Sequence, residues 1–220
     1  MVSRHCTRRS IIFFIFVLVC ISATSVFADD AFLHELSNDT YAFLLAMEAK
    51  EGNGVPENWY RYPDTGSYTS PEETGFYMLS HIGAYEMGLI NKSTAKERIE
   101  KTMDVLLYNW STYQHASQET GLYFRYYNTR TLEVDSFEVS SIGNAMLLAS
   151  LLVIDAWASE QNDTSLSDDA LYLANRMNLG VFYNDTRSLF AHNAQKLYYW
   201  DYYSDEGRLL SFIAHALGQI

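Results

Sequence analysis

The sequence predicts an all-α protein whose helices are paired into an array of α/α hairpins. Three observations favour this fold class. Apolar residues recur at helical spacing over six segments. Mostly apolar segments alternate with two-faced ones, as expected when one set of helices lies inside and the other outside. A sequence motif also returns after about 59 residues, which marks one helix pair as the repeating unit.

Each expected helix is identified by its apolar spacing and by the residues that flank it. The expected segments are residues 32–50, 72–89, 94 onward, 139–161, 165 to about 178, and 206–217. A capping box is expected at Thr94 and Glu97, and the fifth helix is expected to open at Ser165. Residues 145–154 are apolar almost all round, which predicts a helix that is buried on every side.

The internal repeat lies in the loops that follow the two-faced helices. Residues 121–124 (GLYF) lead to 129–132 (TRTL), and residues 180–183 (GVFY) lead to 186–189 (TRSL). A repeated helix pair returns its connecting loops to one end of the array, where binding residues are commonly carried. Tyrosine and tryptophan are concentrated in three such loops, and rings with polar tips suit the faces of sugars. These clusters are residues 59–62, 123–127 and 198–203.

The first 28 residues are expected to be a secretory signal peptide. Three arginines precede an apolar run over residues 11–21, and small residues end at Ala28. We therefore expect a secreted or cell-envelope protein with one mature domain over residues 29–220. The run is about half the length of a membrane span, so no integral membrane segment is expected after cleavage. Both cysteines lie in this leader, so the mature chain would have no disulfide.

Charge narrows the possible partners. The formal net charge is −12, and loss of the leader arginines brings it to about −15. Such a surface repels nucleic acid and anionic membranes, whereas a neutral oligo- or polysaccharide is compatible with it. The six histidines show no metal-ligand spacing, so no metal or cofactor is expected. His81 and His215 fall on apolar helices, which is typical of core or cleft histidines.

Acidic residues precede the three mostly apolar helices. Glycoside hydrolysis uses such carboxyl groups in pairs: an acid that protonates the leaving oxygen, and a base or nucleophile. A carboxylate is also stabilised by the helix dipole at an N-terminus, so a simple capping role is the alternative interpretation. The acids are Glu72 and Glu73, then Asp135 and Glu138, then Asp201, Asp205 and Glu206.

Four ordered segments make the chain resemble the glycoamylase-like domains of cyclic β-1,2-glucan synthases and β-1,2-glucan hydrolases. The family patterns are PPDNY with TSPTNIGLYLLS, then FYNWYDTRTL, VSSVDNGNLAASL and YDLLASEARLASFIAIAKG. The matching segments here are 55–60 (VPENWY) with 69–80 (TSPEETGFYMLS), then 123–132 (YFRYYNTRTL), 139–151 (VSSIGNAMLLASL) and 200–218 (WDYYSDEGRLLSFIAHALG). They cover most of the mature chain in the same order.

The resemblance implies an α/α toroid, incomplete here with about three helix pairs, and a glucan-binding cleft. Glu206 matches the family glutamate and is the expected catalytic acid, with Asp201 as the expected base. Arg208 and Asn144 would hold sugar hydroxyls. The remaining expected substrate-binding residues are Trp59, Tyr127, Arg130 and Trp200.

Two departures keep other functions open. The family aspartate of the DTR motif is Asn128 here, and that of the VSSVDNG motif is Gly143. Neither residue can supply a carboxylate, so a non-catalytic glycan-binding or cell-envelope protein is the alternative to a hydrolase. A third hypothesis is an interaction module. Its exposed apolar flank would be covered by a second copy of the chain or by a partner that supplies the second half.

Overall fold

The computed structural model describes residues 30–49, 52–61, 64–196, 198–200 and 205–220. The chain divides into two compact units, Met1–Tyr41 and Ala42–Ile220. In the first unit, the described residues 30–41 are helical, and the Ser37 and Thr40 hydroxyls each donate to a carbonyl four residues earlier. The expected signal peptide lies outside the described residues.

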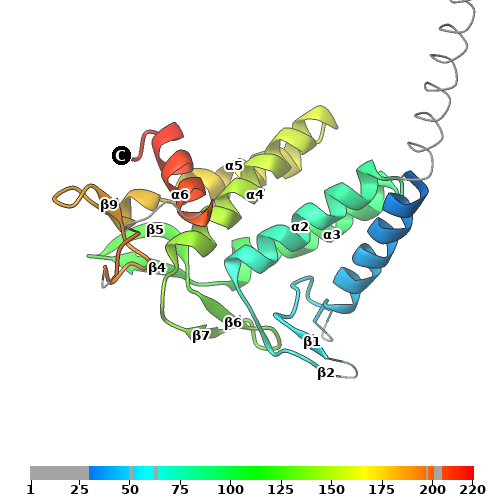
Figure 1. Cartoon of the computed structure of the whole chain (residues 1–220), viewed down its shortest axis with the longest axis horizontal. Helices are drawn as coiled ribbons and strands as arrows, with labels where there is room; N and C mark the ends of the chain where they lie inside the picture. The colour runs from blue at the N-terminus through cyan, green and yellow to red at the C-terminus, as the bar shows by residue number, and fades with distance from the viewer. Residues whose placement is uncertain (1–29, 50–51, 62–63, 197, 201–204) are drawn as a thin grey trace, which may run out of the picture. The chain divides into compact units, whose positions relative to one another are not determined.

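The second unit is mostly helical and confirms the expected series of helices (Figure 1). Residues 42–46 are helical and fall within the first expected segment. The later helices are α2 (Pro71–Glu86), α3 (Lys92–Asp104), α4 (Ser141–Glu160), α5 (Thr164–Arg176) and α6 (Asp205–Ala216). A π-helical turn, η1 (Val105–Asn109), extends α3, and a 3₁₀ turn, η2 (Leu179–Phe182), follows α5.

The helices pack as consecutive pairs around α4. Helix α2 packs on both α3 and α4, and α4 also packs on α5 and α6. Figure 1 shows α2 beside α3 and α4 beside α5, which is the predicted arrangement of helix pairs. The mostly apolar α4 therefore touches three other helices, and this explains why its sequence has no continuous polar face.

Helix α4 supplies the centre of the hydrophobic core. Leu147, Leu148, Leu151 and Ile154 are fully buried. Val153 is 48% exposed, so the expectation of burial on every side was wrong for one edge of the helix. Among the described residues, α4 is the one helix long and apolar enough to cross a membrane, and 61% of its apolar window is buried inside the fold.

The starts of α3 and α5 differ from the expected ones because side chains farther upstream form the caps. The Asn91 side chain accepts from the Thr94 backbone N–H at 2.9 Å, so the capping box expected at Thr94 was wrong. Asp163 caps α5, where Ser165 was expected. A capping box does occur at α2. The Ser70 hydroxyl accepts from the Glu73 backbone N–H at 3.3 Å and donates to the Glu73 carboxylate at 2.8 Å.

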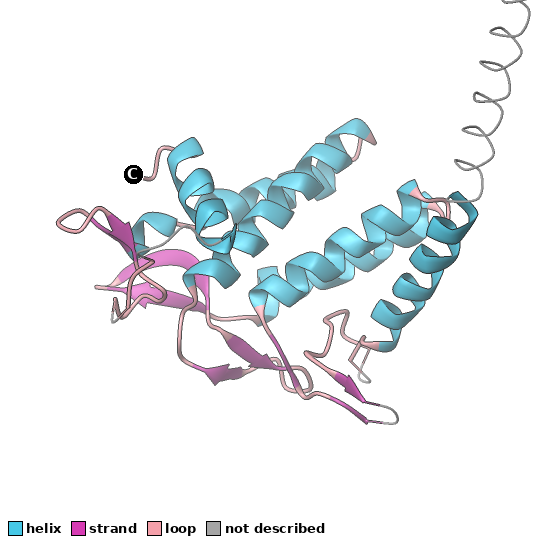
Figure 2. Cartoon of the chain, viewed as in Figure 1, coloured by secondary structure: helices cyan, strands magenta, loops and turns pink. Residues whose placement is uncertain are grey.

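Short antiparallel strands in the connecting loops add to the predicted all-α fold (Figure 2). A three-stranded sheet joins β3 (Tyr68–Thr69), β6 (Tyr126–Asn128) and β7 (Val134–Ser136) in the order β3-β6-β7. The other ladders are β1 (Tyr60–Arg61) with β2 (Asp64–Thr65), β4 (Thr112–His115) with β5 (Gln118–Tyr123), and β8 (Tyr183–Asn184) with β9 (Leu189–Phe190).

The internal repeat corresponds to two hairpins that begin their turns with asparagine. The Asn128 side chain accepts from the backbone N–H groups of Arg130 and Thr131, and the Asn184 side chain accepts from Arg187. Such turns use the asparagine side chain as a substitute for a backbone carbonyl. Asn128, which stands where the resembling family has aspartate, therefore has a structural role in this chain.

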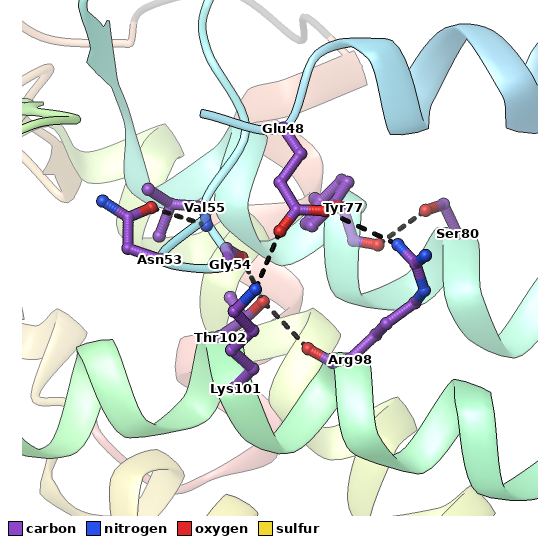
Figure 3. Close-up of polar contacts among 9 residues, drawn as sticks. All are labelled: Glu48, Asn53, Gly54, Val55, Tyr77, Ser80, Arg98, Lys101 and Thr102. Atoms are coloured by element: carbon purple, nitrogen blue, oxygen red, sulfur yellow. Dashed lines mark hydrogen bonds and ion pairs between the residues drawn. The ribbon is translucent and has the colours of Figure 1, made fainter. Parts of the chain in front are cut away.

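A polar network fixes the loop that precedes β1 to α2 and α3 (Figure 3). The Glu48 carboxylate accepts from the Tyr77 hydroxyl at 3.1 Å and pairs with Lys101 at 3.0 Å and Arg98 at 3.5 Å. The Thr102 hydroxyl donates to the Gly54 carbonyl of the same loop. These bonds join the loop to α2 and α3, and they fix the position of the segment that leads to Trp59.

Candidate functional site

The N-terminal ends of α2 and α4 are brought together by the β3-β6-β7 sheet. Strand β3 leads through Ser70 into α2, and β7 is followed by residues 137–140 and α4. Because β6 pairs with both strands, the acids that precede the two helices are placed at one edge of the fold. We call this edge the α2–α4 rim and define it by Glu72, Arg125, Glu138, Ser141, His192, Asn193 and Trp200.

Glu72 reaches from the first turn of α2 to the first turn of α4. A Cβ atom added to Gly143 would lie only 2.1 Å from Glu72 Oε2, so this oxygen fills the space that the glycine leaves. Oε2 is shielded from solvent and has no hydrogen-bond partner among the described residues. Burial raises the pKa of Glu72, and the charge of Glu73 raises it further, while hydrogen bonds from its own backbone N–H and from Ser70 and the charge of Arg125 oppose the shift.

Arg125 and Glu138 form the charged pair of the rim. The Arg125 guanidinium lies 2.7 Å from Glu138 Oε2, and the Arg125 backbone N–H donates to the Glu138 carbonyl at 2.7 Å. The Asn193 side chain donates to the other Glu138 oxygen at 3.4 Å. Asn193 Oδ1 is buried and has no hydrogen-bond partner within the described part of the chain. The pair is partly exposed, so it can meet a ligand.

An aromatic pair borders these charges. The rings of His192 and Trp200 stack with their centroids 3.9 Å apart and their planes at 27°. The Trp200 indole N–H donates to the Ser141 hydroxyl at 3.2 Å, and this hydroxyl donates to the His192 carbonyl at 3.0 Å. The stack is thereby fixed to the first turn of α4. A half-buried indole held at the first turn of α4 is suited to binding a sugar.

Of the expected catalytic residues, Glu206 lies in α6 by its backbone, but its side chain is outside the described residues. Asp201 is also outside the described residues. Arg208 is exposed on α6, which packs on α4. Both carboxyl assignments therefore stay predictions.

The other expected binding residues divide into buried and exposed groups. Asn144 is fully buried, and its amide exchanges two hydrogen bonds with the Tyr123 backbone, at 2.8 and 2.9 Å. Tyr127 is also fully buried, and its ring stacks on that of Trp110 with the ring centroids 3.9 Å apart. These two side chains hold the fold beneath the rim. Trp59, 43% exposed, precedes β1, and Arg130 is exposed in the β6–β7 turn.

Sequence reasoning noticed the acids of the rim but missed their partners. Glu72 and Glu138 were indicated by their places before apolar helices. Arg125, His192 and Asn193 come from loop segments, and their approach to α4 depends on strand pairing and on the Ser140–Asn193 bridge. Arg125 lies inside the aromatic stretch YFRYY, which was the available signal. Among the described residues, no group of three or more His, Cys, Asp or Glu side chains could hold a metal ion.

No family model matches the sequence, and no curated protein matches it. Solved structures do match. A "putative glucoamylase" from Bacteroides fragilis NCTC 9343 has a TM-score of 0.69 at 15% identity, over 85% of this chain and 47% of that one. An endo-β-1,2-glucanase from Chitinophaga pinensis, in complex with sophorotriose and glucose, has a TM-score of 0.64 at 13% identity, over 82% and 47%.

A β-1,2-glucanase from Parabacteroides distasonis also matches, with a TM-score of 0.58 at 11% identity, over 74% of this chain and 24% of that one. This chain thus spans less than half the length of the three structures. At these identities the likeness shows the fold, which is that of a glycoamylase-like domain, and the resemblance predicted from the four motifs is confirmed.

Proposed function

We propose, from this glycoamylase-like fold, that the protein is a secreted carbohydrate-active protein of glycoside-hydrolase type that acts on a glucan at the α2–α4 rim. The observation that carries the proposal is the meeting of Glu72, the Arg125–Glu138 pair and the Trp200 ring at one edge of such a fold. The C. pinensis enzyme was solved with sophorotriose, so a β-1,2-linked glucan is the first substrate to test.

In this proposal Glu206 is the acid that protonates the leaving oxygen, and Asp201 is the base. In the sequence both precede or begin α6, the helix that packs on α4. Arg208 would hold a sugar hydroxyl, and Trp200 would stack on a sugar face. Trp59 and Arg130 would extend the contact surface. Asn144 and Tyr127 would keep the loops beneath the rim in place.

The hydrolase proposal is tested by release of reducing ends from β-1,2-glucan, with β-1,3- and α-1,4-glucans in parallel. We expect Glu206→Gln to lower the hydrolysis rate by about 100-fold or more, because loss of a general acid typically costs 10²–10⁴-fold. Glu160→Gln, an exposed change at the end of α4, is the control and should keep the wild-type rate. Equal rates for wild type and Glu206→Gln would remove Glu206 from the mechanism.

A second candidate, non-catalytic glycan binding, is favoured by two observations. Asn128 uses its side chain to form a turn, and Gly143 supplies no carboxyl group of its own. This alternative predicts heat of binding in calorimetry with sophorotriose and no release of product over long incubation. Any glucan hydrolysis that disappears in Glu206→Gln contradicts it.

A further inference from the structure

We infer that Glu72 is a glucan-contacting carboxyl group of the rim, held in the space that Gly143 leaves open at the first turn of α4. This inference rests on the proposed function and deepens it. It assigns a specific hydrogen-bonding role to an acid that belongs to neither the expected acid–base pair nor the expected set of sugar-binding residues.

The first argument is steric. Glu72 Oε2 occupies the position that any side chain at residue 143 would need, since an added Cβ would lie 2.1 Å from it. Real carbon atoms do not approach a carboxylate oxygen this closely. The absence of a side chain at Gly143 is therefore the condition that lets the Glu72 carboxyl group reach α4.

The second argument is the set of polar atoms around the first turn of α4. Glu72 Oε2, His192 Nε2 and Asn193 Oδ1 are all shielded from solvent, and none has a hydrogen-bond partner among the described residues. An unpaired buried polar atom destabilises the fold, so several such atoms together require an explanation. Sugar hydroxyls both donate and accept hydrogen bonds, so their chemistry matches that of all three atoms.

The third argument comes from the sequence patterns. The resembling motif TSPTNIG has threonine where this chain has Glu72, and VSSVDNG has aspartate where it has Gly143. The two differences are reciprocal. One carboxyl group is lost from α4 and another is gained on α2, and the gained group fills the space beside the lost one.

The neighbouring Glu73 provides a contrast, because its role is accounted for. Its carboxylate accepts from the Ser70 hydroxyl at 2.8 Å as part of the α2 capping box. The Glu72 carboxyl group also accepts hydrogen bonds from its own backbone N–H and from the Ser70 hydroxyl, but its Oε2 has no partner among the described residues; burial raises the pKa of both glutamates. Glu73 therefore serves as the matched control position for Glu72.

The chemistry of the contact follows from the surroundings of Glu72. Glu73 and Arg125 act on it with opposite charges, and Glu138 pairs with Arg125. Because the pKa of Glu72 is raised, its protonated form persists to higher pH than in an exposed glutamate and can donate to a sugar oxygen. The contact should weaken as pH rises through this pKa. Glutamine keeps a donor and removes the titration.

The test is calorimetric binding of sophorotriose to the full chain between pH 4 and 8. We expect Glu72→Ala and Gly143→Ala each to weaken binding about tenfold, the value of one good hydrogen bond. The double variant should be no weaker than either single one, since both changes remove the same contact. Glu72→Gln should keep the affinity and flatten its pH dependence. Glu73→Gln should lower thermal stability and leave the dissociation constant within about twofold.

The outcomes separate the two proposals. Wild type that binds no glucan overturns both this inference and the proposed function. Wild type that binds, with Glu72→Ala unchanged, overturns the inference and leaves the proposed function standing. An unchanged pH dependence in Glu72→Gln also overturns it. Circular dichroism checks that each variant folds, and if Gly143→Ala does not fold, the comparison of Glu72→Ala with Glu72→Gln still decides.

Discussion

At the scale of the residue, the clearest physical signal is a histidine in the core. His81 of α2 is fully buried and meets the Tyr77 ring edge-on, with centroids 4.5 Å apart. Burial lowers the pKa of His81 to about 4, and the charge of Arg98 contributes to the shift, while that of Glu48 opposes it. The sequence placed this histidine on an apolar helix as a core or cleft residue, and its burial confirms that interpretation. The same expectation was wrong for His215, which is exposed on α6.

The free energy of unfolding should therefore decrease as the pH falls from about 6.5 toward 4. The unfolded chain binds a proton on His81 below about pH 6.5, whereas the folded chain resists it down to about pH 4. The contribution is complete above pH 6.5 and is lost as pH falls toward 4, by at most about 3 kcal/mol. Urea unfolding at pH 7 and pH 4.5 measures it. His81→Gln should reduce the difference between the two pH values, and exposed His115→Gln should not; equal effects would refute this account.

At the scale of the element, helix starts show how far local sequence rules reach. The six helices could be predicted because each extends over several turns of apolar spacing. The starts of α3 and α5 could not, because several residues near each of these ends are able to cap. At α5, Asp163 accepts from the Leu166 backbone N–H and also pairs with Lys96 of α3 at 2.5 Å. That tertiary contact selects Asp163 over Ser165.

Removal of this cap should cost more than removal of the expected one. We expect Asp163→Ala to lower the free energy of unfolding by about 1–2 kcal/mol, and Ser165→Ala by less than about 0.5 kcal/mol. A hydrogen bond from Lys96 lowers the pKa of Asp163, so its contribution is present at neutral pH and lost as pH falls through the folded pKa. Chemical denaturation of both variants at pH 7 is sufficient. A larger loss in Ser165→Ala would contradict the assignment.

The strands and the rim were harder to foresee than the helices. Ladders of two to six residues are too short to show alternation in a sequence, so an all-α fold was expected. The sequence does show that the acids of the rim stand close to the starts of predicted apolar helices. The approach of Arg125 and Asn193 to Glu138 depends on strand register, which periodicity does not reveal. Periodicity also cannot tell that the polar side chains of Asn144 and Tyr127 face inward.

At the scale of the whole molecule, stability depends on α4 because it packs against α2, α5 and α6. Leu148 is fully buried at this centre, whereas Val153 on the same helix is 48% exposed. The core of the second unit is continuous around α4, so damage there should affect the unit as a whole.

We expect Leu148→Ala to lower the free energy of unfolding by about 2–5 kcal/mol, through lost burial and the cavity left behind. Val153→Ala should cost no more than about 0.5 kcal/mol, as is usual for surface positions. Both values come from equilibrium denaturation followed by circular dichroism. Similar losses in the two variants would mean that α4 is not the centre of the core.

The close approach of Glu72 to the backbone of Gly143 has a consequence for how the chain can evolve. A mutation that gives residue 143 a side chain displaces the carboxyl end of Glu72, and it displaces nothing there once position 72 is shortened. Because the two sites share one space, the effect of a mutation at either position depends on the residue that the other helix carries.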